Sequence, residues 1–315
     1  MQLGFFLSSE EHGPGELISF AQAAERSGIT AVMISDHFHP WLDEQGQSPF
    51  VWSVIGGIAA STKLSVTTGV TCPTVRIHPA IIAQAAATSA LLLPGRFRLG
   101  VGSGENLNEH ILGDAWPPVR TRLEMLEEAV TLMREMWRGG LVSHHGRHYT
   151  VANARLYSVP DDPPPVLVSA FGPKAAATAA RIGEGLVTTS PAQDVIAEYR
   201  RLGGRGSVVA AVKVCWAESR DEAVRTVYRL WRTEGLHGQL AQELPMPLHF
   251  AQATELVSED AVAEAIPCGP EPDAYIAAIG KYRDAGVDEL FINQIGKQQD
   301  GFLRFMREEI ATAVV

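Results

Sequence analysis

The chain has 315 residues, of which 46% are hydrophobic and 20% charged, so it can fill a large core and lacks the composition of a disordered protein. The formal net charge of -10 argues against a nucleic-acid partner, whose phosphates would be repelled. Three scattered cysteines exclude a disulfide framework or a zinc cluster, and no apolar run reaches the roughly 18 residues of a membrane helix. We therefore expect a cytoplasmic protein that starts directly with a strand, without a leader, and binds neither membranes nor nucleic acids.

Short apolar runs alternate with longer amphipathic stretches, which is typical of a parallel sheet covered by helices. In the first half of the chain, strands are predicted over 3–7, 31–35, 64–70 and 97–101. Helices are predicted over 15–27, 50–60, 79–92 and 119–137. The first helix ends at Gly28, as a C-terminal cap would, and Pro79 opens the third.

The second half continues the same alternation after a small excursion with short β segments at 144–157. Strands are predicted over 166–170, 185–189, 208–214 and 289–293, and helices over 174–181, 192–202 and 302–311. A long helical insertion, at about 221–265, separates the last two strands. Eight strands with crossover helices predict an α/β fold, a closed (β/α)8 TIM barrel, with residues 1–315 in one domain.

The loop after the second predicted strand concentrates polar side chains. Residues 35–41 read SDHFHPW, which places Asp36, His37, His39 and Trp41 directly behind an apolar strand. A lone loop histidine is more often bonded to a backbone carbonyl. Active sites of barrels, however, lie at the carboxyl ends of the strands, and this position favours a functional role. His37 is a candidate general base because imidazole titrates near neutrality.

The loop after the fourth predicted strand is rich in glycine. Residues 102–109 read GSGENLNE, in which Glu105 is a second catalytic candidate; the alternative is a solvated loop glutamate. The GxGxG spacing does not indicate a Rossmann site, because no acidic residue follows about 20 positions later at the end of a second strand. Small residues here would instead let a flat ring approach the backbone.

Two further loops offer binding features. Gly69 interrupts a strand rich in β-branched residues, which suggests a bulge or the close approach of a ligand. Gly172 precedes a helix whose free N–H groups could hold a phosphate, although many helices begin this way without a ligand.

A metal centre is the main alternative for the histidine pair. His37 and His39 have the H-x-H spacing of metal-dependent barrel hydrolases, which also need ligands from later strands. Predicted strands five and six end in Ser169-Ala170 and in 188–190 (TTS), which supply no such ligand. We expect no metal.

Three motifs together resemble the luciferase-like flavin and deazaflavin oxidoreductases, specifically the branch of F420-dependent glucose-6-phosphate dehydrogenase and F420-dependent secondary alcohol dehydrogenase. They are SDHFHPW at 35–41, TCPTVRIHPA at 71–80 and GSGENLNE at 102–109, and the similarity spans nearly the whole chain. The resemblance implies coenzyme F420, with FMN as the alternative, and a homodimer formed through early helices.

The resemblance also implies residue roles. It places the deazaflavin ring near Asp36, with a non-prolyl cis peptide bond between Gly69 and Val70 supporting it. His37 would take the hydroxyl proton of the substrate, Trp41 would shield the reacting face, and Glu105 would manage the proton at the ring or substrate. Further cofactor contacts are implied for Ser103, Gly104, Asn108, Ala170, Phe171 and Gly172, the last at the phosphate of the cofactor tail.

The sequence departs from the sugar-phosphate members of this branch. Those enzymes place basic residues after strand six, in the insertion and after strand eight. Here the corresponding residues are 189–192 (TSPA), 263–265 (AEA) and 298–301 (QQDG). Lys297 alone does not replace the several basic side chains that bind the phosphate in those enzymes. We expect a small-molecule substrate other than glucose 6-phosphate: a neutral alcohol, a free sugar, or a carbonyl or imine.

Trp231, His237 and His249 in the insertion are candidate wall residues of the substrate site, with ordinary packing as the alternative. Two other functions remain open. One is an FMN-dependent monooxygenase on the same barrel. The other is a non-catalytic cofactor-binding homologue, against which the intact set of His37, Trp41 and Glu105 argues.

Overall fold

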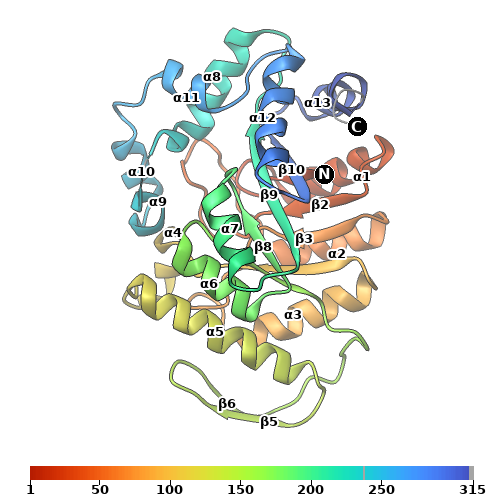
Figure 1. Cartoon of the computed structure of the whole chain (residues 1–315), viewed down its shortest axis with the longest axis vertical. Coiled ribbons are helices and arrows are strands. Elements are labelled where there is room, and N and C mark those ends of the chain that lie inside the picture. Colours follow the sequence, from red (N-terminus) through yellow and green to blue (C-terminus); the bar gives the residue numbers. More distant parts are fainter. Residues whose placement is uncertain (237, 312–315) are drawn as a thin grey trace.

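The computed structural model describes residues 1–236 and 238–311 (Figure 1). A closed barrel of eight strands lies at its centre, in the order β1-β10-β9-β8-β7-β4-β3-β2, and every neighbouring pair is parallel. Its strands are β1 (Gln2–Leu7), β2 (Ala31–Ile34), β3 (Ser65–Thr68), β4 (Phe97–Val101), β7 (Val166–Ser169), β8 (Gly185–Thr188), β9 (Ser207–Val214) and β10 (Glu289–Gln294). The predicted TIM barrel is confirmed.

Helices surround the barrel and follow its strands in the chain (Figure 1). They are α1 (Pro14–Arg26), α2 (Val51–Ser61), α3 (Pro79–Leu92), α4 (Asn106–Glu109), α5 (Val119–Met136), α6 (Pro173–Ile182), α7 (Gln193–Arg201), α12 (Pro272–Asp284) and α13 (Gln299–Phe305). The predicted excursion is an antiparallel hairpin of β5 (Val142–His145) and β6 (Thr150–Ala154), at the bottom of the view in Figure 1.

The insertion between β9 and β10 is helical, as predicted. It contains α8 (Arg220–Trp231), α9 (Leu240–Glu243), α10 (Pro247–Ala253) and α11 (Glu259–Ala265). An isolated parallel bridge between Cys215 and Cys268 joins the two ends of the insertion. Both thiols and that of Cys72 are free and buried. None of the described helices has the length and hydrophobicity needed to span a membrane.

The core has two layers because successive strand residues point to opposite sides. One layer fills the barrel interior and includes Met33, Val187, Ala211 and Phe291, while a larger one packs the outer strand faces against the helices. Gly4 makes room for Phe291, since a Cβ on Gly4 would lie 2.5 Å from the Phe291 ring. Each buried aliphatic or aromatic side chain contributes about 1.5–3 kcal/mol, and this packing fixes the positions of the strand ends.

Several predicted boundaries were wrong. The strand predicted at 64–70 spans Ser65–Thr68, and beyond it only an isolated bridge between Thr71 and Val101 continues the pairing with β4. The helix predicted at 302–311 begins at Gln299 and continues in a π-helical turn over Met306–Ile310. Helices α4 and α12 were not predicted.

Candidate active site

The implied cofactor residues gather at one side of the barrel mouth. Asp36 follows β2, Gly69 and Val70 follow β3, Ser103 and Gly104 follow β4, and residues 170–172 follow β7. These four strands are consecutive in the closed barrel, and all their carboxyl ends point the same way. Parallel pairing of these strands therefore assembles segments that are far apart in the sequence into one continuous surface.

Asn108 connects the two predicted catalytic groups. Its Nδ2 lies 3.2 Å from Nδ1 of His37 and donates to Oε2 of Glu105, also at 3.2 Å. Its Oδ1 accepts the backbone N–H groups of Phe38, at 2.8 Å, and His39, at 3.2 Å. Glu105 is the N-cap residue of α4, and this helix turn brings Asn108 back over Glu105. Asn108 thus holds the loops after β2 and β4 together, and its implied contact with a cofactor stays a prediction.

Glu10, at the end of β1, was missed by the sequence analysis. Its Oε1 lies 3.4 Å from Nε2 of His37, and both side chains are at most 10% exposed. Its Oε2 accepts hydrogen bonds from Ser35, at 2.6 Å, and Ser8, at 2.9 Å. Burial opposes ionisation, but His37 and these hydrogen bonds outweigh it and hold the pKa of Glu10 below its usual value. The rule applied to the other strands, polar residues just after a strand, would have found Glu10.

Asp36 is part of a buried charge cluster. Oδ1 of Asp36 accepts a hydrogen bond from Arg76 at 3.0 Å, and Oδ2 accepts one from Thr71 at 2.7 Å. The Arg76 guanidinium also lies 3.8 Å from the fully buried Glu109, whose Oε2 accepts the backbone N–H of Arg76 at 2.7 Å. Burial raises the pKa of Glu109. Both Asp36 oxygens are engaged within the protein, so Asp36 anchors this loop.

Small residues at the ends of β3 and β4 leave few side-chain atoms projecting beyond the backbone. The cis peptide bond between Gly69 and Val70 is present, as the resemblance implied. A Cβ on Gly102 would lie 2.8 Å from a methyl group of Val70, and Gly104 has a φ of +93°, which favours glycine. Ser103 lies between these two glycines. This surface can accept a flat ring close to the backbone.

The segment after β7 closes this side of the mouth. The side chain of Ala170 is fully buried, and its backbone N–H donates to Val187 at 3.0 Å. Phe171 is 54% exposed, and Gly172 is the N-cap residue of α6. A Cβ on Gly172 would meet no protein atom within 4 Å. The space beside this helix N-terminus is therefore open to an anion.

Trp41 links the site to the insertion. Its ring centroid lies 5.2 Å from that of His37 and 5.2 Å from that of Phe250 in α10. Trp231 in α8 is buried and donates its indole N–H to Glu11 at 2.6 Å. His249 is half-buried in α10, and His237 lies outside the described residues. The insertion thus supports Trp41 from behind through Phe250, while Trp41 itself lies beside His37.

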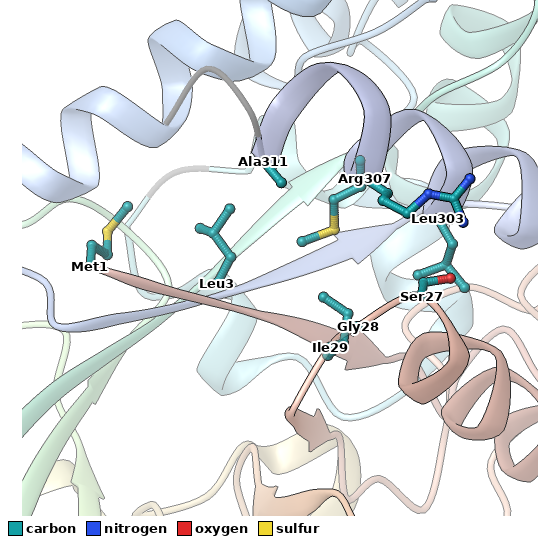
Figure 2. A pocket seen from close by; sticks show the side chains of 9 residues that line it. Met1, Leu3, Ser27, Gly28, Ile29, Leu303, Arg307 and Ala311 are labelled. Atoms are coloured by element: carbon teal, nitrogen blue, oxygen red, sulfur yellow. The ribbon is translucent and has the colours of Figure 1, made fainter. Parts of the chain in front are cut away.

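Other parts of the molecule lack these features. A cavity of about 490 Å³, lined by Met1, Leu3, Ile29 and Leu303 among others (Figure 2), lies at the amino ends of β1 and β2, away from the carboxyl ends of the strands. Among residues 1–236 and 238–311, no group of three or more His, Cys, Asp and Glu side chains is arranged to hold a metal ion. Nδ1 of His39 instead lies 2.8 Å from the carbonyl oxygen of Leu107. The carboxyl ends of the strands remain the candidate site.

Comparison with known proteins gives consistent matches over most or nearly all of the chain. The model of the luciferase-like monooxygenase family matches residues 1–289. F420-dependent glucose-6-phosphate dehydrogenase of Microbacterium testaceum is 35% identical over 98% of this chain and 96% of its own length. The same-named protein of Mycobacterium avium is 33% identical over 99% and 97%.

Solved structures agree with these sequence matches. An F420-dependent secondary alcohol dehydrogenase, solved with an F420-acetone adduct, superposes with a TM-score of 0.91 at 29% identity, covering 100% of this chain and 99% of that one. The F420-dependent tetrahydromethanopterin reductase of Methanopyrus kandleri has a TM-score of 0.78 at 19% identity, covering 100% of each chain, and shares the fold.

Proposed function

The chain belongs to the luciferase-like monooxygenase family, and from this premise we propose that it is an F420-dependent oxidoreductase that acts on the alcohol or carbonyl carbon of a small neutral molecule. One observation carries the proposal: His37 is held by Glu10 on one side and by Asn108 with Glu105 on the other, at the edge of a surface shaped for a flat ring. When bound, the deazaflavin would supply the group that accepts or donates the hydride.

The residues present fit such a cofactor. At Val70, Gly102 and Gly104 few side-chain atoms project, so the ring can lie against the backbone. At Gly172 the open N-terminus of α6 offers N–H groups to a phosphate. Phe171 leaves an apolar face exposed beside it. We propose that these residues, with Ser103, hold the cofactor, while Asp36 and Asn108 act by fixing the loops that carry them.

His37 is proposed to take the proton of the substrate hydroxyl, and to return it in the reverse direction. Glu10 would orient the ring for this transfer, because its carboxylate lies 3.4 Å from Nε2. Reduction of a deazaflavin takes up a proton besides the hydride, and Glu105, joined to His37 through Asn108, would exchange this proton with the ring or the substrate. Trp41 would cover this face and exclude water from it.

A neutral substrate is favoured by the charges around the mouth. The loop after β8 and helix α11 carry no basic residue, and Lys213 on β9 is paired with Glu234 at 2.9 Å. A phosphate dianion would therefore find little compensation there. Because the curated relatives are named for glucose 6-phosphate, that compound is the first to compare with a simple secondary alcohol and with free glucose.

The test of the proposed function is a titration of the purified protein with oxidised F420 and, in parallel, with FMN, followed by fluorescence quenching. Saturable F420 binding at least about tenfold tighter than FMN binding, with F420 reduction by a secondary alcohol but not by glucose 6-phosphate, is the expected result. Preference for FMN would point to a monooxygenase. Binding of F420 without turnover of any alcohol or carbonyl would point to a non-catalytic homologue.

The assembly is also a proposal. Ile81 and Leu92 on α3, and Phe50 at the start of α2, each expose more than half of their side chains. We propose that these early helices form the interface of a cytoplasmic homodimer, which light scattering of the purified protein would test.

A further inference from the structure

The proposed cofactor surface occupies the ends of β2, β3, β4 and β7, and this leaves the ends of β1, β10, β9 and β8 for the substrate. His37 lies at the border between the two halves, since its partner Glu10 follows β1. Residues at the ends of β9 and β10 therefore face the part of the substrate that does not touch the cofactor.

Lys213 and Asn293 are opposite each other in this second half. They are paired in the parallel register of β9 and β10, near the carboxyl end of each strand. Ala211 and Phe291 precede each by two residues and belong to the cluster inside the barrel. Because side chains alternate along a strand, Lys213 and Asn293 point into the barrel as well, one layer nearer the mouth.

Asn293 has an unpaired acceptor. The residue is 3% exposed, and its Oδ1 is buried without a hydrogen-bond partner in the described part of the chain. Buried polar atoms of proteins nearly always have a partner, because leaving one unpaired is costly. A donor from a ligand would satisfy Oδ1 at this position.

The surroundings of Lys213 define what that ligand can be. Its Nζ lies 2.9 Å from Glu234 and 4.4 Å from the centre of the Trp231 ring, so its charge is already neutralised. The ammonium side chain is 22% exposed and keeps further N–H donors free of the single pair with Glu234. Oδ1 of Asn293 is an acceptor, and Nζ of Lys213, which lies over the Trp231 ring, is a donor whose charge is neutralised. A hydroxyl group both donates and accepts, so it matches this pair.

We propose that Asn293 and Lys213 bind a second hydroxyl group of the substrate, which narrows the substrate class to diols and polyols. Oδ1 of Asn293 accepts a hydrogen bond from this hydroxyl, and Nζ of Lys213 donates one to it. The inference rests on the proposed function, because it assumes that an alcohol carbon is oxidised at His37.

The experiment compares F420 reduction by butan-2-ol, butane-2,3-diol and butane-1,3-diol, in wild-type protein and in the variants N293L and N293D. In the wild type, the kcat/KM of whichever diol reacts faster is expected to exceed that of butan-2-ol by about tenfold or more. N293L is expected to lose this preference, so that its kcat/KM values for the diols fall to within about threefold of its value for butan-2-ol. N293D, which retains an acceptor oxygen, is expected to retain the preference.

A second readout needs no turnover. Protein loaded with reduced F420 cannot oxidise an alcohol, so calorimetry measures binding alone, and the dissociation constants should show the same dependence on Asn293. N293A replaces N293L if circular dichroism shows that N293L is unfolded.

The outcomes separate the two proposals. Oxidation of butan-2-ol without a diol preference, or an equal loss for all three alcohols in N293L, would overturn the inference and leave the proposed function standing; a buried water would then be the partner of Oδ1. Absence of F420 binding and of any alcohol oxidation would overturn the proposed function, and the inference with it.

Discussion

Nε2 of His37 lies 3.4 Å from Oε1 of Glu10, although the two residues follow different strands of the barrel. The imidazole is thereby fixed between a carboxylate and the amide of Asn108, whose Nδ2 lies 3.2 Å from Nδ1. A carboxylate in this position orients the ring and stabilises the imidazolium that forms when the ring takes a proton, which makes Glu10 a positioning residue for proton transfer.

Replacing Glu10 by Gln is therefore expected to lower kcat for alcohol oxidation by about 10²-fold, because the imidazolium loses its opposite charge. The dissociation constant of F420 should change little, since Glu10 lies on the substrate side. The measurement is steady-state kinetics over a pH series, with F420 titrations on the same protein. E264Q, which changes an exposed carboxylate in α11, is the control and should match the wild type. A parallel loss of cofactor affinity in E10Q would contradict the positioning role.

The barrel itself could be predicted from the sequence because its strands are buried on both sides and read as apolar runs between amphipathic helices. Helix α12 was missed although Pro272 stands at its first turn, because its mixed sequence shows only a weak apolar stripe. Helix α4 has four residues, too few for any periodicity. Its consequence, the placement of Asn108 against Glu105, was therefore not predicted either.

The motifs predicted which loops form the site, but they did not predict the partners of the site residues. Glu10 meets His37 because β1 pairs in parallel with β2, which brings the loops after these two strands together. Arg76 was seen in the sequence only as part of a motif, and its pairing with Asp36 depends on how the loop after β3 folds back. Such pairings are long-range contacts, which composition and spacing do not encode.

The Asp36–Arg76 pair leads to a prediction on stability. The Arg76 side chain is 6% exposed and faces Asp36 and Glu109, so R76M would leave two buried carboxylates without a counter-charge. We expect the free energy of unfolding to fall by about 3–5 kcal/mol, measured by urea denaturation. R120M removes an exposed arginine that pairs with Glu124 and should cost less than about 1 kcal/mol. Similar losses in both variants would show that the buried charge cluster contributes no more to the free energy of unfolding than an exposed ion pair does.

Gly172 gives a test of the cofactor surface that does not depend on turnover. The protein leaves the space of a Cβ open at this position, so G172V should fold, with a loss of about 1 kcal/mol because valine is a poorer N-cap residue than glycine. A bound phosphate would meet the new side chain, and we expect F420 to bind about tenfold more weakly. G140V, at a second open glycine in the loop before β5, is the matched control. Unchanged F420 affinity in G172V would remove the phosphate site from the N-terminus of α6.

Glu11 leads to a prediction on the pH dependence of stability. Burial is the main cause that raises the pKa of Glu11 from 4.5 to about 7, against the hydrogen bonds from Trp231 and Gly296. Between these two pH values the folded protein binds more protons than the unfolded chain, so this group makes stability fall as pH rises through the window.

Glu11→Gln cannot ionise and removes the effect. The unfolding midpoint of wild type should thus decrease relative to E11Q from pH 5 to pH 8, measured by differential scanning calorimetry. Parallel curves for the two proteins would mean that Glu11 is ionised throughout, and that its contacts with Trp231 and Gly296 outweigh its burial.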